Sequence, residues 1–252
     1  SKSLKCILAS SGEEGLDLAN QFLPKGIILD INLPGIDGWF VLNALKDNPR
    51  TRHIPVHIMS IDDFSTKGAQ KGAIGYLSKP VSQDKLDAAF TRLQTFTDKK
   101  IKNLLVVEDD EMTQKGIYEL IQCSDVKITA VSSGKEAIKS MDSNQFDCMI
   151  LDLKLPDMTG FELLDKLEKD LIPPVIVYTG KELTRKENKQ LLTYADSVIV
   201  KGVHSEERLL DETSLFLHQV IEELPQEKQA IIHDLHNIDN IFKGKKIMVV
   251  DD

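Results

Sequence analysis

Cysteine and long hydrophobic runs are both scarce in this chain. The three cysteines, Cys6, Cys123 and Cys148, are odd in number and far apart, which excludes a disulfide framework and a cysteine metal site. Because this cysteine usage suits a reducing compartment, we expect a cytoplasmic protein. No apolar stretch approaches the roughly 18 residues that a membrane-spanning helix needs. No signal peptide is evident either, so we expect no membrane segment.

Positive charge is also in deficit. Aspartate and glutamate number 40 against 31 lysines and arginines, which gives a formal net charge of −9 at pH 7. A general surface for nucleic acid or an anionic membrane needs the opposite balance, so we expect no nucleic-acid partner. The histidines do not have the spacing of metal ligands.

The most informative feature of the chain is a repeat. Residues 28–38 read ILDINLPGIDG and residues 150–160 read ILDLKLPDMTG. Each copy places one acid, Asp30 or Asp152, at the end of an apolar run and just before a proline-containing loop. In open α/β sheets, ligands bind at the carboxyl ends of the strands. The repeat therefore predicts two copies of one functional unit.

The second copy contains a full alternation of strands and helices. Short apolar runs typical of strands lie at 103–107, 126–131, 146–153, 174–178 and 197–200. Amphipathic segments follow them, ending in a helix over 206–222. Such alternation predicts a parallel sheet that is covered on both faces. We therefore predict an α/β fold with a doubly wound five-stranded parallel sheet, flavodoxin-like, of strand order 2-1-3-4-5.

The first copy lacks its first strand and first helix. It begins with a predicted strand at 4–9 and continues with strands at 26–31, 54–59 and 73–77 and a weak helix at 64–71. We expect a truncated first domain over 1–98, a complete domain over 102–223 and a helical connector over 224–244.

Residues 245–252, KKIMVVDD, repeat the pattern LLVVED of residues 104–109. They predict the first strand of a third copy. This strand is also suited to fill the gap that the missing strand leaves in the first sheet, in the same chain or by exchange between molecules.

Polar residues follow the predicted strands of the second copy: Glu108, Asp109, Asp152, Thr179 and Lys201. In the predicted fold they share one edge of the sheet. Three carboxylates repel one another in a partly dry cleft, so the site needs positive charge. Lys201 supplies one charge, and oxygen ligands without nearby cysteine or histidine suit Mg²⁺. Asp152 is then placed to attack phosphorus as a nucleophile.

With these residues in view, both copies resemble receiver domains of two-component phosphorelays. The resemblance implies that Asp152 accepts a phosphoryl group from a phosphohistidine. It also implies that Glu108, Asp109, Asp152 and the main-chain carbonyl of Lys154 bind Mg²⁺. Thr179 matches the family's switch hydroxyl and Lys201 its phosphate-pairing lysine. The implied partner is a histidine kinase or a histidine phosphotransfer domain, and receiver–receiver or homodimer contacts are further expectations.

In the first copy the same resemblance assigns Asp30 as acceptor, Asn32 as carbonyl donor, Ser60 as switch hydroxyl and Lys79 as the lysine. The acids that would hold the metal in this copy are not in the chain, so we expect it to bind Mg²⁺ poorly. The order of domains resembles a segment of a multi-receiver hybrid sensor histidine kinase, although no kinase core is found in these residues. Receivers of this family catalyse their own phosphoryl transfer and hydrolysis.

The second copy departs from the family pattern at Gly202 and Val198, and its Glu108 is a tolerated variant of the more usual aspartate. Gly202 follows the lysine where the family usually has a proline, often after a cis bond, whereas the first copy keeps Pro80. Val198 occupies the aromatic switch position, which Tyr76 fills in the first copy. These departures put in doubt the shape of the loop after the fifth strand and aromatic-coupled signalling.

Two other functions compete with phosphoacceptor signalling. Pseudo-receivers keep the fold and act by docking alone, which the missing acids and Gly202 favour. Haloacid-dehalogenase-like phosphatases have a second aspartate two residues after the nucleophile, but Asn32 and Lys154 stand there. His233 and His236, on the connector, are expected to be solvated rather than phosphotransfer residues.

Overall fold

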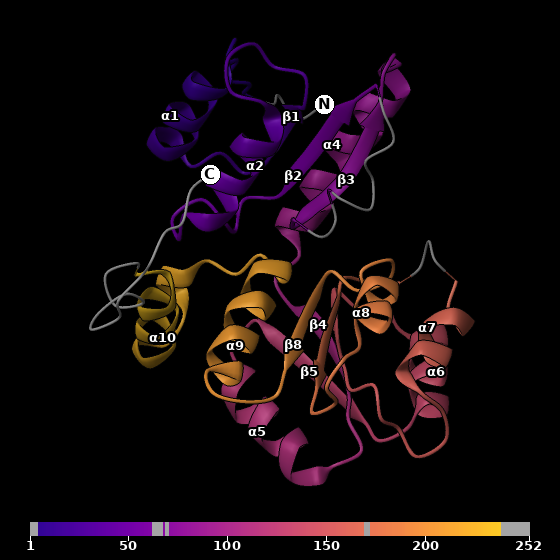
Figure 1. Cartoon of the computed structure of the whole chain (residues 1–252). Coiled ribbons are helices and arrows are strands. Elements are labelled where there is room, and N and C mark those ends of the chain that lie inside the picture. The colour runs from indigo at the N-terminus through magenta and orange to yellow at the C-terminus, as the bar shows by residue number, and fades with distance from the viewer. Residues whose placement is uncertain (1–4, 62–67, 69–70, 169–171, 238–252) are drawn as a thin grey trace, which may run out of the picture.

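The computed structural model describes residues 5–61, 68, 71–168 and 172–237 (Figure 1). It contains two parallel sheets, each with its own helices, that follow one another along the chain. We refer to these parts as the first and the second domain. The final helix lies beside the second domain (Figure 1).

The second domain has five parallel strands in the order β5-β4-β6-β7-β8. The strands are β4 (Lys102–Val107), β5 (Val126–Val131), β6 (Cys148–Leu151), β7 (Val175–Thr179) and β8 (Ser197–Val200). Numbered from β4, this is the order 2-1-3-4-5, so the predicted doubly wound sheet is confirmed.

Helices cover both faces of this sheet. They are α5 (Glu111–Ile121), α6 (Gly134–Ser143), α7 (Gly160–Lys166), α8 (Arg185–Leu191) and α9 (Ser205–Phe216). Side chains alternate between the faces of a strand, so β4 buries Leu105 in one core and Leu104 in the other. Leu105 packs in the core that contains Leu163 of α7, and Leu104 in the core that contains Ile117 of α5. Burying each such side chain stabilises the fold by about 1.5–3 kcal/mol.

The first domain has three parallel strands in the order β1-β2-β3. The strands are β1 (Ile27–Asp30), β2 (Val56–Ser60) and β3 (Ala73–Ser78), and the helices are α1 (Gly12–Phe22), α2 (Gly38–Asp47) and α4 (Gln83–Asp98). Its core includes Leu29, Leu42 and Ile58.

The prediction of a strand at 4–9 is wrong for residues 5–9, which are the part of this segment that the structure describes. Residues 5–9 form no strand and are exposed, including Leu8 at 87%. In the second domain the matching strand, β5, pairs only with β4. Within the described part of the first domain no strand corresponds to β4, so residues 5–9 have no backbone partner to pair with. The helix predicted over 64–71 falls mostly outside the described residues.

The helix predicted over 206–222 ends early, at Phe216. His218 adopts a positive φ of 51°, which the helix cannot continue through. A short 3₁₀ helix (Ile221–Glu223) and α10 (Gln226–His236) follow. Leu210 of α9 and Ile232 of α10 share a small core. The remainder of the predicted connector and the predicted strand at 245–252 lie outside the described residues.

The two domains meet where the loop of residues 48–55, between α2 and β2, lies against α9 and α10. Arg52, only 2% exposed, forms an ion pair with Asp211 of α9 and donates from Nη2 to the Asp211 carbonyl oxygen at 3.2 Å. His236 Nε2 of α10 lies 2.9 Å from Asp211 Oδ1 and 2.9 Å from Arg52 Nη1. We call Arg52, Asp211 and His236 the interdomain clasp. The expectation that His236 is a solvated residue is therefore wrong, because α10 folds back onto α9.

Further buried polar groups adjoin the clasp. Lys46 donates from Nζ to the carbonyl oxygens of Arg52 at 2.9 Å and Ile54 at 2.7 Å. Burial, followed by the charge of Arg52, lowers the pKa of Lys46 to about 7. The His218 ring packs edge-on against Phe96 at 4.8 Å between centroids, with its Nδ1 3.1 Å from the His53 carbonyl oxygen. Lys46 therefore holds the loop to α2, and the contact between His218 and the His53 carbonyl joins the loop to the second domain.

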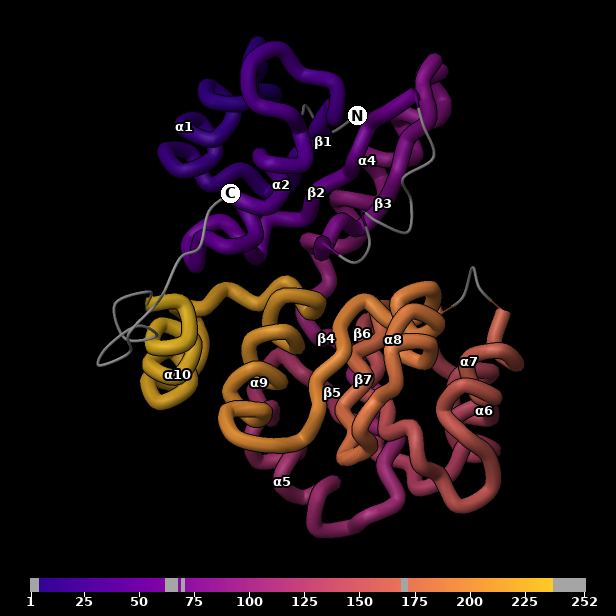
Figure 2. Tube along the Cα trace, in the orientation of Figure 1, coloured from indigo at the N-terminus to yellow at the C-terminus, as the bar shows by residue number. Residues whose placement is uncertain are grey.

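The chain trace shows how α9 relates to both domains. Its C-terminal end lies beside the first domain, and its N-terminal end faces away from it (Figure 2). Among the described helices, none combines the length and apolar character required to cross a bilayer.

Candidate functional site

The candidate site lies at the carboxyl edge of the second sheet. Glu108 and Asp109 follow β4, Asp152 follows β6, Thr179 ends β7 and Lys201 follows β8. The ladder of backbone hydrogen bonds continues to these residues: Asp152 N–H donates to the Val107 carbonyl at 2.9 Å and Lys201 N–H to the Thr179 carbonyl at 2.8 Å. The backbone at Asp152 and Lys201 is therefore held by the sheet itself rather than by a loose loop.

Three carboxylates gather at this edge. Glu108, Asp109 and Asp152 each offer an oxygen, and these atoms all lie within 4.8 Å of one another. Glu108 is 2% and Asp152 7% exposed, whereas Asp109 is exposed. The cluster contains hard oxygen donors and neither sulfur nor imidazole, which suits Mg²⁺. One open side, at Asp109, leaves room for water or phosphate oxygens beside such an ion.

Lys201 provides the positive charge within this cluster. Its Nζ donates to Glu108 Oε2 at 2.7 Å and to Asp152 Oδ2 at 3.4 Å. Burial raises the pKa of Glu108, and the hydrogen bond and charge of Lys201 only partly offset this. Burial alone would lower the pKa of Lys201, but its hydrogen bond to Glu108 and the charges of Asp152 and Glu108 outweigh burial and raise it. Lys201 is therefore held as an ammonium between two acids.

The other predicted residues take supporting positions. Lys154 donates its N–H to Asp152 Oδ1 at 3.3 Å, so its recorded contact is through the amide rather than the carbonyl. Thr179 is fully buried, and its Oγ1 accepts the Lys181 N–H at 3.2 Å. The structure thus brings Glu108, Asp109, Asp152 and Lys201 together, with Thr179 at the end of the neighbouring strand.

Two polar residues beside the site were outside the sequence prediction, namely Tyr178 and Ser205. The Ser205 hydroxyl accepts the Gly202 N–H at 3.2 Å and lies 3.2 Å from the Tyr178 hydroxyl. The Tyr178 ring lies beneath Lys201, with Nζ 5.2 Å from its centroid. A useful signal in the sequence is that Tyr178 directly precedes Thr179.

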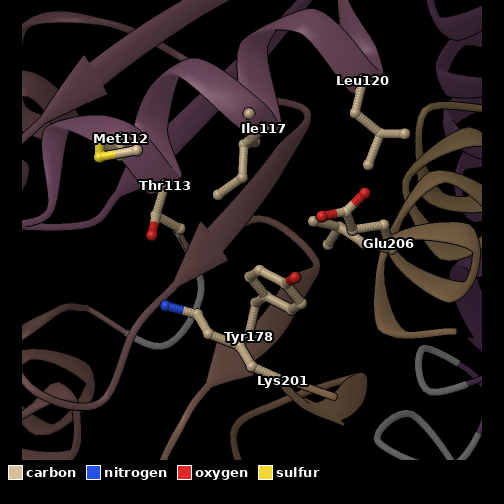
Figure 3. Close-up of a pocket in the computed structure, with 9 residues that line it drawn as sticks. Met112, Thr113, Ile117, Leu120, Tyr178, Lys201 and Glu206 are labelled. Carbon is tan, nitrogen blue, oxygen red and sulfur yellow. The ribbon is translucent and has the colours of Figure 1, made fainter. Parts of the chain in front are cut away.

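A pocket of about 290 Å³ opens beside Tyr178, between α5 and α9 (Figure 3). The side chains of Ile117 and Leu120 from α5 face Tyr178 and Glu206 across it (Figure 3). Lys201 borders both this pocket and the carboxylate cluster.

The first domain repeats part of the same arrangement. Lys79 forms an ion pair with Asp30, and the Asn32 N–H donates to Asp30 Oδ1 at 3.0 Å. Ser60 is fully buried, and its carbonyl oxygen accepts the Lys79 N–H at 2.8 Å. The Lys79–Pro80 peptide bond is cis. Among the described residues, no second acid joins Asp30 in a cluster of three potential ligands.

Comparison with known proteins gives consistent matches. Residues 1–91 and 104–213 match the family model of the response regulator receiver domain. The response regulator PleD of Caulobacter vibrioides is 38% identical over 96 residues, which are 37% of this chain and 20% of PleD. The polar-differentiation response regulator DivK of Brucella ovis is 42% identical over 81 residues, which are 30% of this chain and 64% of DivK.

The matched region therefore spans less than two thirds of either relative. Among solved structures, a CheY-like receiver domain from Methanospirillum hungatei JF-1 shares 26% sequence identity with a TM-score of 0.43, covering 49% of this chain and 99% of that chain.

Proposed function

Because the chain belongs to the response regulator receiver domain family, as two receiver domains in tandem, we propose that Asp152 accepts a phosphoryl group from a phosphohistidine. One observation carries the proposal: a buried carboxylate, a partly buried lysine and two further acids share one edge of the second sheet. The donor would be a histidine kinase or a histidine phosphotransfer domain. The tandem order further suggests a multi-receiver hybrid histidine kinase as the parent protein.

The transfer requires little covalent chemistry from the protein. An Asp152 oxygen forms a bond to phosphorus while the phosphorus–nitrogen bond of the donor breaks, and the bonding pair stays on the imidazole. Lys201 lies 3.4 Å from Asp152 and can follow the charge to the phosphoryl oxygens. Thr179 ends the adjacent strand and offers its hydroxyl. Mg²⁺, held by Glu108, Asp109, Asp152 and the Lys154 carbonyl, would neutralise part of the charge of the transferred group.

The first domain would perform the same reaction at Asp30 when its acidic pair is supplied. Asp30 already contacts Lys79, with Ser60 at the end of the neighbouring strand. In the chain described, we expect weak Mg²⁺ binding at this domain and slow phosphorylation of Asp30.

Acetyl phosphate with Mg²⁺ tests the proposal, with the gain of one phosphoryl group read by intact mass. The wild-type protein should take up an acid-labile group that Asp152→Asn loses and that EDTA prevents. Asp142→Asn, at an exposed position of α6, is the matched control and should retain the label. A label that persists in Asp152→Asn at the wild-type level would reject Asp152 as the acceptor.

A docking module that works without phosphate is the second candidate. The direct Asp30–Lys79 ion pair and the absence of a second acid among the described residues of that site favour it for the first domain. If docking alone is the function, Asp30→Asn and Asp152→Asn should leave partner binding unchanged, and acetyl phosphate should not label the wild-type chain.

A further inference from the structure

The loop that follows the site lysine is held differently in the two domains. In the first domain Lys79 precedes Pro80, and Ser82 caps α4 by accepting the Lys85 N–H at 3.4 Å. In the second domain Lys201 precedes Gly202, and the residue that precedes α9 is His204, with a φ of 60° and no side-chain cap. The second loop therefore lacks both the proline and the cap that fix the first.

Ser205 makes the contacts that replace them. Its hydroxyl accepts the Gly202 N–H at 3.2 Å, a bond that a proline at this position could not donate. The Gly202 carbonyl in turn accepts the Ser205 N–H at 3.2 Å, which closes the loop between Lys201 and α9. Ser205 is 5% exposed, so these bonds do not compete with bulk water.

The same hydroxyl reaches the strand below. Tyr178, 6% exposed, places its own hydroxyl 3.2 Å from Ser205 Oγ. Its ring lies under the Lys201 side chain, with Nζ 5.2 Å from the centroid, a favourable position for a cation. Ser205 thus ties together the backbone after Lys201 and the ring beneath Lys201.

We propose that Ser205 is a positioning residue for phosphoryl transfer, which holds the Lys201 ammonium on Asp152 through Gly202 and Tyr178. This inference rests on the proposed function of Asp152. It explains how the domain keeps a working lysine without the proline of the first domain.

Two matched pairs of variants test the inference by the rate of Asp152 phosphorylation with acetyl phosphate and Mg²⁺. Ser205→Ala removes the hydroxyl and Ser205→Thr keeps it. Gly202→Pro removes the donor, whereas Gly202→Ala keeps it and finds its nearest neighbour, the Val200 carbonyl, 4.0 Å away. Each of Ser205→Ala and Gly202→Pro removes the neutral hydrogen bond from the Gly202 N–H to the Ser205 hydroxyl. We therefore expect both variants to be phosphorylated about fivefold more slowly than the wild-type protein. Ser205→Thr and Gly202→Ala should react at the wild-type rate.

Thermal melting of each variant separates slow reaction from unfolding, and if one slow variant does not fold, the other pair decides. Rescue by threonine is an outcome that a purely structural loss at this position would not give. Equal rates in all folded variants would overturn the inference alone. A wild-type chain that takes up no phosphoryl group would overturn the proposed function, and the inference with it.

Discussion

At the scale of single residues, the site depends on one lysine among buried acids. Removing a partner from a buried ion pair leaves an uncompensated charge, which typically costs about 3–5 kcal/mol. Lys201 is one quarter exposed, with 25% of its side chain accessible, so we expect Lys201→Met to destabilise the protein by about 2 kcal/mol at pH 7. Chemical denaturation measures this.

The pH dependence of this variant follows from Glu108. Burial raises the folded-state pKa of Glu108 above its ordinary 4.5. Between pH 4.5 and the folded-state pKa, the folded state therefore binds more protons than the unfolded state. Stability from this group is therefore greatest in acid and falls as the pH rises through the folded pKa. Without Lys201 the pKa should rise further, and Lys201→Met should regain stability when the pH is lowered from 7 to 5. Lys181→Met, at an exposed ion pair with Glu187, should show neither effect.

His57 provides a second prediction for one residue. Its side chain is 3% exposed, and within the described part of the chain neither ring nitrogen has a hydrogen-bond partner. Burial, followed by the charge of Arg92, lowers the pKa of His57 from 6.5 to about 4. The unfolded state therefore takes up a proton that the folded state does not, and stability falls as the pH drops from 6.5 to about 4.

Ile176 occupies the matching place in β7, which makes His57→Ile the natural replacement. We expect the variant to lose this acid destabilisation, a difference on the order of 2–3 kcal/mol between neutral pH and pH 4. Unfolding free energies of both proteins across this range measure it. An unchanged acid slope would show that His57 does not remain neutral in the fold.

At the scale of elements, the start of a helix is determined by residues that are close together in the sequence. Thr159 caps α7 by accepting the Glu162 N–H at 3.2 Å, and Glu162 accepts the Thr159 N–H at 2.7 Å. Losing such a cap typically costs about 1 kcal/mol. Thr159→Ala should therefore lower the unfolding free energy by about this amount. Lys166→Ala, at the exposed end of the same helix, should change it by less than half as much, and equal effects would argue against the cap.

The order of strands in the second domain was predictable because it depends on local periodicity and on the handedness of crossovers. The residues at which helices and strands begin and end were less predictable. The helix predicted over 206–222 ends at Phe216, and His218, just beyond it, has a φ of 51° and packs its ring on Phe96 of the first domain. The strand at 4–9 has the right local pattern, but a strand exists only when another strand pairs with it.

The residues of the candidate site likewise include some that the sequence predicts and some that it does not. Glu108, Asp152 and Lys201 follow strands, so the fold alone was enough to predict that they meet. Ser205 and Tyr178 are 27 residues apart, and their contact depends on the path of the loop between β8 and α9. No periodic pattern encodes that path.

At the scale of the whole molecule, the interdomain clasp connects the two domains through a buried ion pair. Burial acts to raise the pKa of Asp211, but the hydrogen bond from His236 and the charge of Arg52 outweigh it and keep the pKa low. Arg52 and Asp211 lie 159 residues apart in the chain, so no local pattern could have predicted the pair.

We expect Arg52→Ala to separate the unfolding of the two domains. The wild-type chain should melt in one transition, whereas the variant should melt in two, with a loss of about 3–5 kcal/mol from the unpaired Asp211. Differential scanning calorimetry resolves the transitions. Arg50→Ala, at an exposed position in the same loop, should behave as wild type. A single unshifted transition in Arg52→Ala would mean that the clasp does not join the domains.

The direction of α9 has a consequence for how the molecule can be approached. The loop of residues 48–55 precedes β2, so the first domain contacts its neighbour through the amino ends of its strands, and Asp30 stands at the opposite edge. Asp152 likewise lies at the edge from which α9 starts, away from the first domain (Figures 1 and 2). Each aspartate therefore lies at the strand end that is away from the contact between the two domains. If both accept phosphoryl groups as proposed, we expect no direct transfer between them within one chain, and we expect a protein docked at one aspartate to leave the other accessible to a second partner.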